Sequence, residues 1–197
     1  MKDILIIVMT GILTNNYVLF KFMGVCPFLG ATSRNRSALY MSAATGVTMI
    51  VSSALTWLLW NKVMVPFGIE YLRTLVFLFT IAAVVAVLEL LLKIFKGEIA
   101  KGMGIYLPLI PTNCAVLGLC VTNVTEGYSL GVTLANGFGS ALGFALAMVM
   151  FSGVRERIER SNIPESFRGA PISLLAAAIV SLSFIGFSGL SVGLFGM

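Results

Sequence analysis

Long apolar stretches alternate with short polar segments along the whole chain. Six of these stretches reach the roughly 20 residues that a helix needs to cross the hydrocarbon core of a bilayer. They lie around residues 4–24, 38–60, 72–95, 103–122, 128–153 and 170–190. The segments between them are too short for a soluble domain. The pattern therefore predicts an all-α integral membrane protein whose residues 1–197 form a single polytopic domain with six transmembrane helices.

Two short polar interruptions, one in each half of the chain, are similar in sequence. The pattern Thr-Asn-x-x-Val-Leu followed by Gly-x-Cys runs from Thr14 to Cys26 and occurs again from Thr112 to Cys120, where Cys114 directly follows the Asn. This favours an internal repeat, with residues 1–98 and 99–197 holding three spans each. Because three is odd, the second repeat must be inverted, and inverted repeats typically place a binding site where they meet near the midplane. Chance similarity in an apolar sequence is the alternative.

The same interruptions predict that helices 1 and 4 are broken into half-helices. Pro108 and Pro111 remove backbone donors from the fourth span, and Asn15 and Asn16 interrupt the first. Free backbone groups at such a break are tolerated only where protein or a cavity satisfies them, and Asn side chains can cap the half-helix ends. Two ordinary proline-kinked helices are the alternative interpretation.

Composition and charge support a membrane location. Charged residues make up 11% of the chain, against roughly 25% in a typical soluble domain. Nine basic residues lie in the connections between spans 1–2, 3–4 and 5–6: Arg34, Arg36, Lys93, Lys96, Lys101, Arg155, Arg157, Arg160 and Arg168. The opposite side holds three, namely Lys2, Lys62 and Arg73. Since basic loops mark the cytoplasmic side, the net charge of +5 indicates topology rather than nucleic-acid binding, and both termini are expected to face outward.

The three cysteines are the candidates for chemistry, because the chain has no histidine and polar groups inside a membrane often mark the working site. Thiolates favour zinc, copper(I) and iron–sulfur clusters, but a structural zinc or a 2Fe–2S cluster normally needs four protein ligands. A site built on Cys26, Cys114 and Cys120 must therefore be completed elsewhere, most simply by a second polypeptide. For each cysteine taken alone, packing as a small hydrophobe is the alternative.

Lys21 is a charged residue that lies within the first predicted span without an obvious local partner. Its long side chain can reach the membrane interface while its stem stays in the apolar region. Alternatively, its ammonium group can contact a negatively charged centre built on Cys26.

Several motifs resemble those of a known membrane family. They are residues 19–28 (LFKFMGVCPF), 71–74 (YLRT), 107–118 (LPLIPTNCAVLG), 155–157 (RER) and 167–170 (FRGA). Together they resemble the integral-membrane A subunit of the Rnf complex, the ion-translocating ferredoxin:NAD oxidoreductase. The E subunit of the sodium-pumping NADH:quinone oxidoreductase is a close relative with the same cysteine elements.

The resemblance implies a subunit of a redox-driven pump for sodium ions or protons in the bacterial cytoplasmic membrane. It implies a heterodimer with a homologous subunit of opposite topology, in which each chain gives two cysteines to an intramembrane 2Fe–2S cluster. The matching residues here are Cys26 and Cys114, and Cys120 lies outside the matched element and is expected to be structural. Pro111 stands where the family often has Thr or Val, which should accentuate the helix break without removing the ligand.

The resemblance also implies that this chain has no complete active site. Flavin and further iron–sulfur centres are expected on other membrane and soluble subunits. Two alternatives stay open: the equivalent subunit of the sodium-translocating NADH:quinone oxidoreductase, and a non-redox inverted-repeat transporter whose cysteines only pack.

Overall fold

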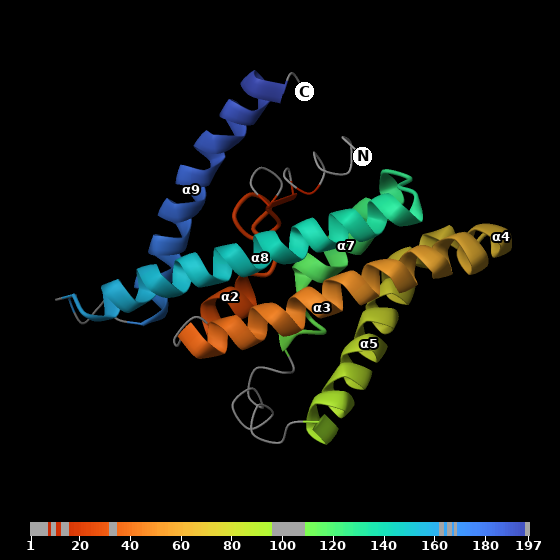
Figure 1. Ribbon diagram of the computed structural model, residues 1–197, viewed down its shortest axis with the longest axis horizontal. Helices are drawn as coiled ribbons and strands as arrows, with labels where there is room; N and C mark the ends of the chain where they lie inside the picture. Colours follow the sequence, from red (N-terminus) through yellow and green to blue (C-terminus); the bar gives the residue numbers. More distant parts are fainter. Residues whose placement is uncertain are drawn as a thin grey trace.

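The described part of the computed structural model is helical and contains no strand (Figure 1). It covers residues 8, 11–12, 16–31, 35–95, 109–161, 164, 167 and 169–195. The α-helices are α2 (Val25–Ala31), α3 (Asn35–Leu59), α4 (Val65–Phe67), α5 (Arg73–Phe95), α7 (Cys114–Thr125), α8 (Leu130–Glu159) and α9 (Ala170–Phe195). A π-helical turn, Trp60–Met64, joins α3 to α4, and a 3-10 turn, Glu70–Leu72, precedes α5.

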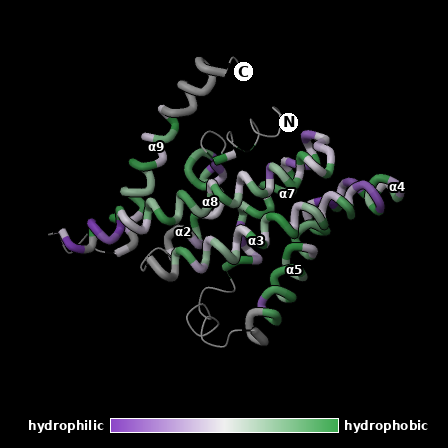
Figure 2. The backbone as a smooth tube through the Cα atoms, viewed as in Figure 1, coloured by the Kyte–Doolittle hydropathy of each residue, from purple (hydrophilic) through white to green (hydrophobic). Residues whose placement is uncertain are grey.

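Three of the described helical stretches are long and apolar enough to cross a membrane: Ala38–Phe67, Glu70–Leu91 and Leu130–Ile158. Two shorter apolar helices cover Cys114–Thr125 and Pro171–Gly186. Figure 2 shows that the helices are mostly hydrophobic and that hydrophilic residues gather near helix ends. These findings confirm the all-helical fold of the described residues, and the three long apolar helices suit a membrane protein. The count of six spans stays a prediction, because residues 4–7, 9–10, 13–15 and 103–108 of spans one and four lie outside the described residues.

Helix α5 is buried on one face and exposes apolar side chains on its other faces. It buries the stripe Phe77, Ile81 and Val85, which are spaced four residues apart and so share one face of the helix. Its other faces carry large apolar side chains that are exposed, such as Phe79, which is 70% exposed. A helix that is hydrophobic all round but buried on one stripe only is suited to contact with lipid on its remaining faces.

Helices α3 and α8 run antiparallel and side by side through the centre of the bundle (Figure 1). As residue numbers rise along α3, the residues they contact on α8 have falling numbers. A Cβ on Gly46 would lie 3.3 Å from the Cβ of Ala141, and a Cβ on Gly137 would lie 2.9 Å from Ser53 Oγ. Near the end of α3 and the start of α8, Trp57 Nε1 donates a hydrogen bond to the backbone carbonyl oxygen of Tyr128 at 2.7 Å. Small residues at these crossings let the two backbones approach closely.

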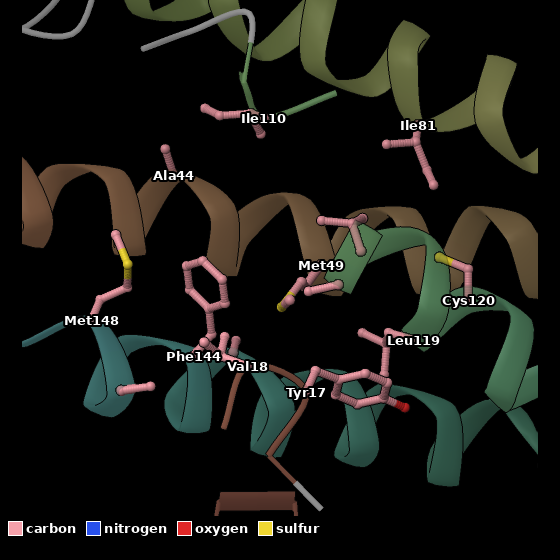
Figure 3. Packing of buried hydrophobic residues seen from close by; sticks show 14 of the residues in the cluster. Tyr17, Val18, Ala44, Met49, Ile81, Ile110, Leu119, Cys120, Phe144 and Met148 are labelled. Atoms are coloured by element: carbon pink, nitrogen blue, oxygen red, sulfur yellow. The ribbon is translucent and has the colours of Figure 1, made fainter. Parts of the chain in front are cut away.

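The segment before α2 is part of the apolar core rather than a surface loop. Figure 3 shows Tyr17 and Val18 packed among side chains of α3, α7 and α8, including Met49, Leu119 and Phe144. Residues 16–24 form turns, not a helix. The break predicted in the first helix is therefore present on its α2 side, and it lies inside the bundle.

Helices α3 and α8 carry several buried hydroxyl and amide side chains. Thr45, Thr48, Ser52 and Thr56 on α3, and Thr133, Asn136 and Ser140 on α8, are all less than a tenth exposed. Some of these groups bond to their own helix, as Thr48 Oγ1 does to the Ala44 carbonyl at 2.9 Å. Within the described residues, the hydroxyls of Thr45, Ser52, Thr133 and Ser140 have no hydrogen-bond partner. An unpartnered buried hydroxyl costs free energy unless water or another ligand satisfies it.

A pair of substitutions tests whether such a ligand is present. Thr45 and Thr48 are both fully buried on α3, but only Thr48 has a hydrogen bond within the described residues. We expect Thr48→Val to cost about 1 kcal/mol of stability for the lost bond, and Thr45→Val to be neutral or stabilising because it removes an unpaired hydroxyl. Thermal denaturation in detergent measures both. A larger loss for Thr45→Val than for Thr48→Val would mean that the Thr45 hydroxyl binds a group outside the described residues.

Candidate functional site

Cys26 and Cys114 occupy equivalent places at the starts of two short helices. Cys26 is the second residue of α2, and Cys114 is the first residue of α7. Both thiols are exposed, whereas Cys120 lies halfway along α7 and is fully buried among apolar side chains. Two of the three thiols are therefore accessible to a ligand or another chain, and the third packs in the core (Figure 3).

Position in the fold distinguishes Cys114 from Cys120. The Gly-x-Cys pattern in the sequence pairs Cys26 with Cys120, because each follows a glycine by two residues. Position in the fold instead pairs Cys26 with Cys114, since both lie in the first turn of a helix that follows a non-helical segment. The spacing of a local motif does not report which residues begin a helix; the family resemblance, not the Gly-x-Cys spacing, indicated Cys26 and Cys114.

The two cysteine elements touch each other through Gly24. A Cβ at Gly24 would lie 2.9 Å from Asn113 Oδ1, 3.2 Å from the Cβ of Ala115 and 3.3 Å from the ring of Phe144. Gly24 also has a φ of +85°, which L side chains rarely adopt. Glycine therefore permits both the turn before Cys26 and its contact with the start of α7. The contact lies two residues from Cys26 and one residue from Cys114.

Two asparagines hold the non-helical segments in place. Asn113 is the N-cap of α7, and its Oδ1 accepts a hydrogen bond from the Ala115 backbone N–H at 3.0 Å. Asn16 Oδ1 accepts from the Val18 N–H at 3.0 Å, and its Nδ2 donates to the Gly143 carbonyl of α8 at 2.8 Å. The expected capping by asparagine is confirmed at Asn113. Asn15 lies outside the described residues, and the sequence did not reveal that Asn16 reaches α8.

Lys21 has a partner that the sequence alone did not identify. Its Nζ lies 4.6 Å from the centroid of the Tyr17 ring, within the range of a cation–π interaction. The sequence does contain the feature that could have indicated this contact, because the aromatic residue Tyr17 lies four positions before Lys21. In the same turn, Phe20 and Phe22 are exposed, and Phe22 has a positive φ of 54°. Such a conformation is unusual for an aromatic residue and often marks functional segments.

The donor set of this chain fits half of a cluster-binding site. Among the described residues, no group of three or more Cys, Asp or Glu side chains can hold a metal ion. The thiols of Cys26 and Cys114 are exposed at adjoining elements, and thiolates are the ligands that iron–sulfur clusters require, normally four in number. Beside them, Asn113 Nδ2 is a buried N–H donor that has no partner in the described structure. The arrangement suits a sulfur-rich group completed by a second chain.

Fold and site together define a helical membrane protein with two exposed thiols, each at the start of a short helix. A family model described as "Rnf-Nqr subunit, membrane protein" matches residues 4–191. The chain belongs to this family.

Similar proteins come from several bacteria. The chain is 44% identical to the A subunit of the ion-translocating oxidoreductase complex of Syntrophotalea carbinolica, covering 98% of this chain and 100% of that protein. It is 46% identical to the protein of the same name from Azoarcus sp., over 97% of this chain and 99% of the relative. It is 40% identical to the A subunit of the Na(+)-translocating ferredoxin:NAD(+) oxidoreductase complex of Acetobacterium woodii, over 96% and 99%. The resemblance to the A subunit of the Rnf complex is confirmed.

Proposed function

We propose that this chain is the membrane subunit of a redox-driven ion pump and carries electrons across the bilayer through a 2Fe–2S cluster. Cys26 and Cys114 supply two of the four ligands, and a homologous subunit of opposite topology supplies the other two. The observation that carries the proposal is the position of the two exposed thiols, each in the first turn of a helix and on elements that touch at Gly24 and Asn113.

The relatives support the reaction class. Two of them are named as the A subunit of an ion-translocating oxidoreductase complex, and the third is named for Na(+) translocation with ferredoxin and NAD(+). We extend ferredoxin:NAD oxidoreductase activity to the complex that contains this chain, with sodium ions or protons as the transported species. Flavin and the remaining iron–sulfur centres belong to other subunits of that complex.

The packing of α3 and α8 supports the inverted-repeat architecture of six spans. These are the second helices of the two predicted repeats, and they lie antiparallel, as an axis in the membrane plane requires. The start of α3, with Arg36, therefore lies at the same end of the bundle as the end of α8, with Arg155 and Arg157 (Figure 1). This end is cytoplasmic by the rule for basic residues, and both termini face outward from the cytoplasmic membrane.

Each residue of the site has a role that follows from its position. Bound between the two subunits, the cluster would supply a one-electron centre within the roughly 30 Å of hydrocarbon. Cys26 and Cys114 would hold it from the starts of α2 and α7. Gly24 allows the two elements to meet, and Asn113 fixes the first turn of α7 that carries Cys114. The exposed Phe20 and Phe22 offer an apolar surface beside Cys26 for a membrane-embedded partner.

The test is iron and acid-labile sulfide analysis, with electron paramagnetic resonance, on this chain co-purified with its homologous subunit. We expect a reduced 2Fe–2S signal and about two iron atoms per heterodimer. An intact, folded heterodimer without iron would contradict the proposal and favour the non-redox transporter.

A further inference from the structure

The side chain of Asn113 is satisfied at one end and unpaired at the other. Asn113 is 2% exposed, and its Oδ1 accepts from the Ala115 N–H at 3.0 Å. This bond fixes the amide orientation, because a flipped amide would place its NH₂ group against another N–H donor. Nδ2 consequently points elsewhere, and it has no acceptor within the described structure. Leaving a buried N–H donor unpaired costs free energy, because the donor loses its hydrogen bond to water without gaining another.

The comparison with Asn16 shows that an unpaired amide donor is not a general property of these turns. Asn16 is equally buried and also accepts from a backbone N–H two residues later. Its Nδ2, however, donates to the carbonyl of Gly143 at 2.8 Å. Of these two asparagines, Asn113 is the one whose Nδ2 has no acceptor among the described residues, and Asn113 directly precedes Cys114.

The surroundings of Asn113 indicate what the acceptor is. The amide lies where the two cysteine elements meet, since a Cβ at Gly24 would be 2.9 Å from Asn113 Oδ1. Gly24 precedes Cys26 by two residues, and Asn113 directly precedes Cys114. The candidates for ligands therefore lie on both of the elements that meet at the Asn113 side chain, where the atom facing Gly24 is Oδ1. The thiolate sulfurs and the bridging sulfides of an iron–sulfur cluster are hydrogen-bond acceptors, and such bonds influence its reduction potential.

We propose that Asn113 Nδ2 donates a hydrogen bond to a sulfur of the 2Fe–2S cluster or of its cysteine ligands. The inference rests on the proposed function. A donor directed at sulfur stabilises the reduced cluster, which carries one more negative charge, and so raises the reduction potential. Asn113 is thus a positioning residue with two tasks: its oxygen starts helix α7, and its nitrogen tunes the centre held at Cys114.

The first test is a redox titration of the Asn113→Ser variant in the co-purified heterodimer. Serine is also a good N-cap residue, so α7 should still begin at Cys114, but the amide donor is lost. We expect the cluster to be retained and its potential to become more negative than in the wild type. Asn123→Ser is the matched control. Asn123 lies in α7, ten positions after Asn113, and its Nδ2 is also unpaired among the described residues. Removing this amide should leave the potential of the cluster unchanged.

The second test is pulsed electron paramagnetic resonance of the reduced wild-type cluster, with asparagine labelled with ¹⁵N at the side-chain amide. We expect a nitrogen coupling that Asn123→Ser retains and Asn113→Ser loses. An intact cluster with no such coupling, or an Asn113→Ser cluster with the wild-type potential, would overturn this inference while the electron-carrying function stands. If the Asn113→Ser heterodimer does not bind iron, the presence or absence of the ¹⁵N coupling in the wild-type cluster alone decides whether the inference holds. A wild-type heterodimer without a cluster would instead refute the proposed function.

Discussion

Cys26→Ser and Cys114→Ser are each expected to abolish ferredoxin-dependent NAD⁺ reduction by the assembled complex. A serine hydroxyl is a poor substitute for a thiolate toward iron, so a centre that needs four ligands would lose one. Both residues are exposed, and neither belongs to the buried core, so the substitutions should leave the fold intact. The measurement combines activity in membrane vesicles with the 2Fe–2S signal of the purified heterodimer. Both readouts should fall together.

Cys120→Ser is the control for the two ligand substitutions. Cys120 is fully buried in the apolar core, so a serine there should lower stability slightly and leave the cluster signal in place. If Cys120→Ser removed the signal while Cys114→Ser did not, the pairing of Cys26 with Cys114 by helix position would be wrong. Full activity in all three variants would mean that the cysteines only pack, as in a transporter without a redox centre.

Gly143→Ala is expected to produce the largest loss of stability among the glycine substitutions in α8. A Cβ at Gly143 would lie 2.8 Å from the Gly11 carbonyl oxygen, 3.2 Å from the Cα of Ile12 and 3.3 Å from Asn16 Nδ2. Two of these neighbours are backbone atoms, so the segments must separate, and overpacking of this kind costs roughly 1–3 kcal/mol. The separation would also weaken the bond from Asn16 to the Gly143 carbonyl. Thermal denaturation of the detergent-solubilised complex measures the effect.

Gly153→Ala in the same helix provides the control for Gly143→Ala. Among the described residues, and apart from its chain neighbours and the backbone of its own helix, no atom lies within 4 Å of a Cβ added at Gly153. Because alanine favours a helix over glycine by up to about 1 kcal/mol, this variant should be as stable as the wild type or slightly more stable. Equal melting temperatures for the two variants would show that the close approach of residues 11–12 to α8 does not contribute to stability.

The sequence singled out the candidate site residues but not their arrangement in space. Cys26, Cys114 and the asparagine before Cys114 were all recognised from short polar motifs, because polar groups are conspicuous in an apolar chain. Cys120, which the sequence set aside as structural, is buried in mid-helix. Helix boundaries differed as well: the span predicted to end near residue 60 continues through a π-helical turn to Phe67. Asn61 and Lys62 do not stop it, because a helix can extend beyond the hydrocarbon.

The sequence by itself determined the membrane class, the family resemblance and the candidate residues for a cofactor site. These properties depend on composition and on neighbours along the chain, since about 20 apolar residues suffice to specify a span. Only the tertiary structure decided that Gly24 touches Asn113, that Asn16 bonds to Gly143 and that α3 and α8 pack antiparallel. Each of these contacts joins residues far apart in sequence and depends on how whole helices pack. A local pattern reports which groups are present, whereas packing decides which of them become partners.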